Sequence, residues 1–264
     1  INSRKAWGRD CRRGPNFVGG IKLRPLFQLD PRLSLCASFV PAGAKLADIG
    51  TDHGYLPIWL AKTGRVIHAV AADLRPGPLE RAKENVRKYQ VEDIVELRLS
   101  DGLQAFLPEE ADFIVIAGMG GEVIASILGA VPWLKETGAR LVLQPMTRAE
   151  ELRRFLAEHG FEILEERPVL SLGRPYSVLL TAYTGRQEAG GILFPYLGKL
   201  LQSPLTDKAE RTAALAYLGK QLRHLQNLEK GARAGGEQEA QMEYCQAAEA
   251  LRQLIREEFP NGSN

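Results

Sequence analysis

The chain has 264 residues, of which 45% are hydrophobic, and a formal net charge of +2, so it can bury a sizeable core in one large domain or in one domain with an appendage. Its three cysteines, Cys11, Cys36 and Cys245, are odd in number and far apart, which excludes a disulfide framework and a cysteine zinc site. No apolar run approaches the ~18 residues of a membrane span, and no signal-type apolar region follows the basic start, so we expect a cytoplasmic protein with no membrane or metal partner.

The beginning of the chain is basic and without periodicity. Residues 1–24 carry seven lysines and arginines against Asp10 alone, a balance that suits a polyanion. Chain ends are usually loose unless they are tied down, so we expect residues 1–23 to form a flexible basic segment. The first predicted helix spans 30–40, where Asp30 can cap it and Pro31 suits its first turn.

Five apolar runs of strand length follow, each trailed by a helical pattern. The runs are KLADIG, VIHAVAAD, IVELRLS, DFIVIAG and RLVLQP, and the helical patterns include 78–89, 121–128 and 148–159. This alternation predicts βαβ units and therefore an α/β fold with a mostly parallel sheet covered on both faces. After Gly160, FEILEERPVL and YSVLLTAYT are separated only by the turn SLGRP, which predicts an antiparallel hairpin at the end of the sheet.

The last third of the chain has a different pattern. Loop-forming residues at 184–198 mark a boundary, and two long helical stretches, 206–230 and 237–259, follow with GARAGG between them. Each stretch has one apolar seam with spacings of 3, 4 and 3, which predicts an antiparallel helical hairpin or coiled coil over residues 191–264. A coil that joins two copies of the chain is the alternative, and we favour a monomer. The seam residues are Leu215, Leu218, Leu222 and Leu225 on the first helix and Tyr244, Ala247, Leu251 and Leu254 on the second.

The loop after the first apolar run, DIGTDHG, contains two glycines and two acids. Gly50 and Gly54 allow the backbone to bend sharply and to approach a ligand closely. The spacing is not that of a dinucleotide fingerprint, and Asp48 and Asp52 would repel a pyrophosphate. Acids at this place suit a ligand with a cationic or amino-bearing end.

Chemistry-bearing residues also stand at the ends of the next two runs. Asp73 follows the second run, 25 residues beyond Asp48, where an acid typically accepts hydrogen bonds from ribose hydroxyls. SDGL follows the third run, and its Asp101 and Gly102 suit an adenine amino group, although the same dipeptide is also a generic turn.

The fourth and fifth runs end in an unusual glycine cluster and in an amide. IAGMGGE has three glycines within four residues before a helix, so its backbone amides can face a ligand. Gln144 in LQPM is an uncharged amide that can read the edge of a base, with a helix-entry loop as the alternative. Together the loops predict a ligand with an adenine, a ribose and a cationic tail but no phosphates, which fits S-adenosylmethionine and fits NAD badly.

Six motifs together resemble the bacterial tRNA adenine N1-methyltransferases that modify the adenine at tRNA position 22. They are RLSLCASFVP, LADIGTDHGYLP, AADLRPGPLERAKENV, SDGL, IAGMGGEVI and LVLQPM, within a resemblance that runs from Asp30 to about Tyr183. Gly54 stands where alanine is expected as often, and the first ~20 residues have no counterpart. The resemblance implies a Rossmann-like class I methyltransferase sheet at 24–190, S-adenosyl-L-methionine as cofactor and tRNA as partner.

The resemblance also implies which residues meet the cofactor and the target base. The residues implied for the cofactor are Asp48, Gly50, Asp52 and His53 at its methionine end, Asp73 and Leu74 at its ribose, Asp101 and Gly102 at its adenine, and Gly118, Met119, Gly120 and Gly121 as the wall towards the target base. Around the base we expect Asp52, His53, Met119 and Gln144 as catalytic residues and Arg32, Gln144 and Pro145 as substrate-binding residues.

Adenine N1 carries a free lone pair at neutral pH, so its methylation requires alignment and exclusion of water rather than a strong general base. The N1 atom lies on the Watson–Crick edge, so the base must leave its pairing before it can react. Whether His53 orients the base or only packs is left open.

Two other functions fit parts of the sequence. A methyltransferase for another RNA or a small molecule would be favoured by an Asn/Asp-Pro-Pro-aromatic loop after the fourth run, where AGMGG stands instead. A non-catalytic RNA-binding scaffold would not need the acids and glycines at four successive loops.

Overall fold

The computed structural model describes residues 17–18, 21–22, 26–188 and 190–260. Most of the predicted flexible segment 1–23 lies outside the described residues. Its described part consists of two short antiparallel strands, β1 (Phe17–Val18) and β2 (Ile21–Lys22). In the described part of the chain, no helix combines the length and the apolar character that a bilayer span requires.

A seven-stranded sheet forms the centre of the molecule, in the order β5-β4-β3-β6-β7-β9-β8. The first five of its strands along the chain are parallel, and β9 pairs antiparallel with both β7 and β8, so the predicted mixed sheet is confirmed. The strand order reverses between β3 and β6, where α/β folds bind their ligands. The strands are β3 (Ala44–Ile49), β4 (Val66–Asp73), β5 (Val95–Leu99), β6 (Phe113–Gly120), β7 (Arg140–Thr147), β8 (Phe161–Ser171) and β9 (Arg174–Tyr183).

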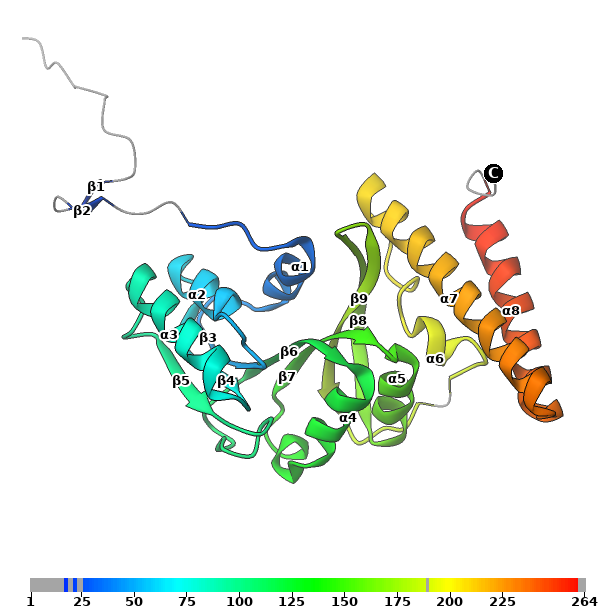
Figure 1. Ribbon diagram of the computed structural model, residues 1–264, viewed down its shortest axis with the longest axis horizontal. Coiled ribbons are helices and arrows are strands. Elements are labelled where there is room, and N and C mark those ends of the chain that lie inside the picture. Colours follow the sequence, from blue (N-terminus) through cyan, green and yellow to red (C-terminus); the bar gives the residue numbers. More distant parts are fainter. Residues whose placement is uncertain (1–16, 19–20, 23–25, 189, 261–264) are drawn as a thin grey trace, which may run out of the picture.

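Helices cover both faces of this sheet (Figure 1). Alternate residues of β3 enter different cores, since Leu46 belongs to the core to which α1, α2 and α3 contribute, whereas Ala47 belongs to the core to which α4 and α5 contribute. Asp30 caps α1 as predicted, because its carboxylate accepts hydrogen bonds from the backbone N–H groups of Arg32 and Leu33. The helices are α1 (Pro31–Phe39), α2 (Tyr55–Lys62), α3 (Pro76–Tyr89), α4 (Gly121–Gly129) and α5 (Ala149–Glu158), with a 3₁₀ turn, η1, at Pro132–Lys135.

Three further helices follow the sheet, namely α6 (Phe194–Leu197), α7 (Lys208–Gly235) and α8 (Gln238–Glu258). The predicted seams of α7 and α8 face each other within the chain and form a third core with α6. The expected GARAGG link is wrong, because α7 continues through Gly235 and only two residues separate it from α8. Gly236 ends α7 in the left-handed conformation, with φ of 74°, and the backbone N–H of Glu237 donates to the Ala232 carbonyl.

A buried arginine fastens the C-terminal helices to the sheet. The fully buried guanidinium of Arg153 on α5 lies 2.5 Å from Glu166 on β8 and 2.8 Å from the Tyr217 hydroxyl on α7. It also donates to the backbone carbonyls of Pro195 and Tyr196. One charged group therefore connects α5, β8, α6 and α7.

Candidate active site

Two cavities adjoin at the carboxyl edge of the sheet, and Gly50 lines both of them. The first cavity, of about 440 Å³, lies between the ends of β3, β4 and β5 and helix α4. The second cavity, of about 360 Å³, lies between the start of α1, the loop after β3 and the end of β6. Four of the loops singled out in the sequence therefore contribute to one continuous site.

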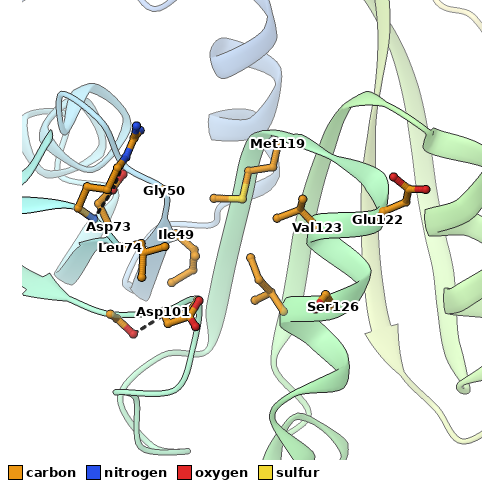
Figure 2. A pocket seen from close by; sticks show the side chains of 13 residues that line it. Ile49, Gly50, Asp73, Leu74, Asp101, Met119, Glu122, Val123 and Ser126 are labelled. Atoms are coloured by element: carbon orange, nitrogen blue, oxygen red, sulfur yellow. Dashed lines mark hydrogen bonds and ion pairs between the residues drawn. The ribbon is translucent and has the colours of Figure 1, made fainter.

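The first cavity is lined by two of the predicted acids. Asp73 ends β4 with a buried carboxylate, which accepts a hydrogen bond of 2.9 Å from the backbone N–H of Arg75. Asp101 follows β5 in the adjacent loop, and Figure 2 places both acids across the cavity from Val123 on α4. Leu74 also lines this cavity and is largely exposed.

The loop that carries Asp101 is held by internal hydrogen bonds. The Ser100 hydroxyl donates to the Gly102 carbonyl at 2.8 Å and accepts from the Ala105 N–H at 3.2 Å. Gly102 has φ of 55°, and a Cβ there would lie 2.9 Å from the Ile127 side chain. The loop thus requires glycine at this position for both its conformation and its close packing on α4.

Met119 lies over Gly50 where the two cavities meet. Gly50 has φ of 75°, and a Cβ on it would lie only 2.2 Å from the terminal carbon of Met119. Figure 2 shows the Met119 side chain extending from the end of β6 towards Gly50. A side chain at position 50 would displace the flexible end of Met119, and the φ of this residue independently favours glycine.

Asp48 is a buried carboxylate beside the second cavity. It is 5% exposed and accepts a hydrogen bond of 2.6 Å from the Thr51 hydroxyl. No lysine, arginine or histidine of the described residues lies within ion-pair distance of it. Burial, with a smaller contribution from the nearby charge of Asp73, raises the pKa of Asp48 to about 6 in spite of the Thr51 hydrogen bond, which lowers it. An acid kept in this environment is suited to a cationic ligand.

Asp52 and His53 also line the second cavity, but Asp52 already has a cationic partner, Arg81. Its carboxylate accepts a hydrogen bond of 3.1 Å from Arg81 on α3 and lies 3.3 Å from the His53 ring. The His53 ring stacks on Tyr55, with 5.3 Å between ring centroids. Among the predicted acids of this loop, Asp48 is therefore the one without a cationic partner in the described part of the chain.

Gln144 does not lie where the sequence led us to expect it. Its side chain is 0% exposed and lines neither cavity. Its oxygen accepts hydrogen bonds from Arg32 at 2.7 Å and from the Gly118 N–H at 3.2 Å, and its nitrogen donates to the Pro145 carbonyl at 2.9 Å. Both amide atoms are thus used inside the protein, and Gln144 holds Arg32, which does line the second cavity.

The glycine cluster after β6 divides between two environments. Gly118 lines the second cavity, whereas Gly120 and Gly121 line neither cavity. A Cβ on Gly121 would lie 2.0 Å from the backbone oxygen of Arg148, so this glycine permits close packing of α4 on the start of α5. Pro145 lines a separate third cavity on the far side of β7 from Gly118.

Helix α4 supplies cavity residues that the sequence reasoning missed. Val123, Ser126 and Ile127 line the first cavity from one face of this helix. Ser126 and Ile127 follow Val123 by three and four residues, so the sequence directly after AGMGG could have predicted that these side chains share one face of the helix next to the ligand. Thr51 and Tyr55 were missed in the second cavity. In the described part of the chain, no group of three or more His, Cys, Asp or Glu residues is arranged to hold a metal ion.

Comparison with known proteins gives consistent matches. Residues 29–179 match the family described as "Methyltransferase domain". The chain is 30% identical over 236 residues to the tRNA (adenine(22)-N(1))-methyltransferase of Bacillus subtilis, an alignment that covers 89% of this chain and 98% of the relative. The crystal structure of the B. subtilis m1A22 tRNA methyltransferase TrmK superposes with a TM-score of 0.70 and 30% identity, covering 86% of this chain and 99% of that one. Streptococcus pneumoniae Sp1610, solved in complex with S-adenosyl-L-methionine, has a TM-score of 0.69 and 32% identity over 83% of this chain and 97% of its own.

Proposed function

The chain belongs to the Methyltransferase domain family and, within it, to the tRNA (adenine(22)-N(1))-methyltransferases, and on this premise we propose that it methylates N1 of the adenine at position 22 of tRNA. It is a methyltransferase, and its cofactor is S-adenosyl-L-methionine. The observation that carries the proposal is the meeting of two cavities at Gly50, with ribose- and adenine-type acids in the first. The second is lined by Asp48, which has no cationic partner among the described residues.

The residues present fit this cofactor. Asp73 at the end of β4 suits the ribose hydroxyls, and Asp101 in the next loop suits the adenine amino group. Asp48 supplies the negative charge that a ligand with an ammonium and a sulfonium group requires. Gly50 lines both cavities, so a ligand that occupies both would cross the chain at this residue, next to the Met119 side chain.

The second cavity suits the target base. Tyr55 is half exposed and stacked on His53, so the two rings offer an aromatic face to a base that has left its stack. Arg32 faces the same cavity and is held in place by Gln144 and Asp30. Gln144 therefore contributes through Arg32 and not by touching the base.

The chemistry places modest demands on these side chains. When bound, the cofactor supplies a methyl group on a positively charged sulfur, which the neutral N1 of adenine can accept without first losing a proton. The protein therefore has to align the base, keep water out and hold the carboxylate of Asp48 close to the positive charge. Met119 at the junction of the cavities contributes an apolar wall to this arrangement.

Further assignments belong to this proposal. We divide the chain into a cofactor-binding domain at residues 24–190 and a helical domain at residues 191–264 that faces the tRNA. A tRNA substrate also supports a location in the cytoplasm, which is the compartment that we expected from the sequence.

Methyl transfer to unmodified tRNA transcripts tests the proposal. Radiolabelled S-adenosyl-L-methionine is expected to label a transcript with adenine at position 22, and mapping is expected to give N1-methyladenosine there. The same transcript with guanine at position 22 is the control and is expected to remain unlabelled. Equal labelling of both transcripts, or labelling of neither by a protein that binds the cofactor, would refute the assignment.

A further inference from the structure

A third cavity of about 270 Å³ lies between the sheet and the C-terminal helices. Its walls come from the turn between β7 and α5, from β9 and from α7. The residues that matter here are Thr147, Arg148, Glu150, Tyr176, Lys220 and His224. None of them belongs to the two cavities described above.

This third cavity begins one strand away from the active site. Thr147, in its wall, is the register partner of Gly120 at the end of β6, and Pro145 is the partner of Met119. A Cβ on Gly120 would lie only 3.3 Å from the Thr147 hydroxyl. A polymeric substrate that enters the second cavity can therefore continue across the end of β7 into the third.

Lys220 is a half-buried ammonium group in this wall, and no carboxylate of the described residues lies within ion-pair distance of it. Its Nζ lies 5.3 Å from the centroid of the Tyr176 ring and 3.4 Å from the Pro175 carbonyl oxygen. Burial lowers the pKa of Lys220, and the positive charges of Arg153 and Arg174 act in the same direction, against the influence of Glu150. Burying a cation without a paired anion is costly, so an anionic ligand that enters the cavity would stabilise the charged form of Lys220.

The other charges of the cavity leave it positive. Glu150 is the acid in the wall, and its carboxylate lies 3.2 Å from the His224 ring, so it is already engaged. Arg148 is 57% exposed, and its closest acid, Glu122, lies 3.8 Å away and is exposed as well. Two cations, Lys220 and Arg148, are thus available on the rim and wall of one cavity.

We propose that the third cavity binds a backbone phosphate of the tRNA strand that carries the target adenine, with Lys220 and Arg148 as its cations. This inference rests on the proposed function, because the strand reaches the cavity from the second cavity. A phosphate is the group that recurs along any RNA strand regardless of sequence, and lysine and arginine neutralise it. The site would hold the strand in place while its adenine lies in the active site.

The experiment compares Lys220→Gln with Lys230→Gln as a matched control. Both residues lie on α7, about 15 Å apart along the helix axis, and Lys230 is exposed and lines none of the three cavities. Each variant loses one positive charge, so both lose the same amount of nonspecific electrostatic attraction to RNA. Binding of a fluorescent tRNA transcript is measured at salt concentrations from about 50 to 200 mM, because the affinity that phosphate contacts supply falls steeply over this range. Cofactor binding and thermal unfolding of each variant are measured as well.

Lys220→Gln is expected to raise the Kd for the transcript about 5- to 20-fold and to reduce the salt slope by about 0.7 to 0.9, while Lys230→Gln changes neither by a comparable amount. Lys220→Arg retains the charge and is expected to restore most of the affinity. Cofactor affinity is expected to stay within about twofold, since Lys220 does not line the first or second cavity.

Several results would overturn the inference while leaving the proposed function intact. One is a Lys220→Gln variant with unchanged tRNA affinity and salt slope, and another is an equal loss in Lys220→Gln and Lys230→Gln. If the wild-type protein binds the cofactor but methylates no tRNA, the proposed function fails, and the inference fails with it. A loss of affinity in Lys220→Gln that Lys220→Arg does not restore also contradicts a phosphate contact.

Discussion

The hydroxyl of Thr51 lies 2.6 Å from the carboxylate of Asp48 and donates a hydrogen bond to it. A buried acid usually pairs with a cation, but Asp48 has this hydroxyl as its partner in the described part of the chain. The bond favours the ionised form of Asp48, yet burial outweighs it and raises the pKa to about 6. The free protein therefore keeps a carboxylate that destabilises its fold when ionised. That cost makes sense if the site binds a cation.

The first prediction concerns stability. The folded pKa of Asp48, about 6, is above its ordinary value of 3.8, so protonation favours the fold, and that contribution is complete below pH 3.8 and lost as pH rises through 6. Asp48→Asn is therefore expected to raise the free energy of unfolding of the cofactor-free protein by up to about 3 kcal/mol at pH 7.5, with no gain at pH 3.5. Urea unfolding at the two pH values measures this. An equal change in the free energy of unfolding at the two pH values would contradict this prediction. Asp93→Asn, a substitution at an exposed site, is the control.

The second prediction concerns cofactor binding by the same residue. A cationic ligand prefers the ionised carboxylate, so the affinity of wild-type protein for S-adenosyl-L-methionine is expected to fall about tenfold per pH unit below about pH 6. Asp48→Asn is expected to bind more weakly at pH 7.5 and to lose this pH dependence. Calorimetric titration of both proteins with S-adenosyl-L-methionine, at pH values from about 5 to 8 that span the pKa of Asp48, tests this prediction. Parallel pH profiles for the two proteins would exclude Asp48 as the group responsible.

The third prediction uses two glycines with similar backbone angles. Gly50 and Gly64 have φ of 75° and 68°, but a Cβ would meet Met119 at the first and nothing within 4 Å at the second. Both alanine variants are expected to lose about 1 kcal/mol of stability from the left-handed backbone. Gly50→Ala alone is expected to lose cofactor affinity by more than about tenfold, because Met119 must move into the cavities. Equal cofactor affinity in the two variants would show that the junction tolerates a side chain.

The fourth prediction concerns Gln144 as the residue that positions Arg32. Gln144→Leu leaves the Arg32 guanidinium and the Gly118 N–H without their shared acceptor, at a cost of about 1 to 3 kcal/mol in stability. The kcat for tRNA methylation is expected to fall about tenfold or more, whereas the Kd for the cofactor changes little. Arg32→Met is expected to lower kcat similarly, and the double variant is expected to be no worse than the more impaired single variant. Additive losses would mean that the two residues act separately.

The fifth prediction concerns the attachment of the C-terminal helices. Arg153→Met leaves Glu166 buried without its cation and removes the hydrogen bonds to Tyr217 and to α6, so a loss of about 3 to 5 kcal/mol is expected. Replacing both partners in Arg153→Met/Glu166→Leu removes the uncompensated charge, and this variant is expected to be more stable than the single one. Urea unfolding measures both. A double variant less stable than Arg153→Met would mean that Glu166 stabilises the fold through other contacts, such as the hydrogen bond that it accepts from the Lys199 N–H.

Local sequence was sufficient for the architecture. Strand-length apolar runs, the cap at Asp30 and the turn at residues 172–173 are properties of neighbouring residues, so they predicted the parallel sheet, its antiparallel end and the helical hairpin. The acids Asp73 and Asp101 were found for the same reason, because parallel strands bring their carboxyl ends to one edge. The GARAGG link was predicted wrongly because glycine lowers helix propensity only modestly, and the burial of Ala232 within this stretch outweighs that effect.

Side-chain partnerships between distant segments could not be predicted in this way. Asp48 and Asp52 look equivalent in the sequence, and folding distinguishes them because Arg81 on α3 reaches Asp52 and not Asp48. Gln144 looked like a free amide until Arg32, 112 residues away in the chain, was found to occupy its oxygen. Such contacts depend on how whole helices pack on the sheet, and a pattern of neighbouring residues carries no record of that packing.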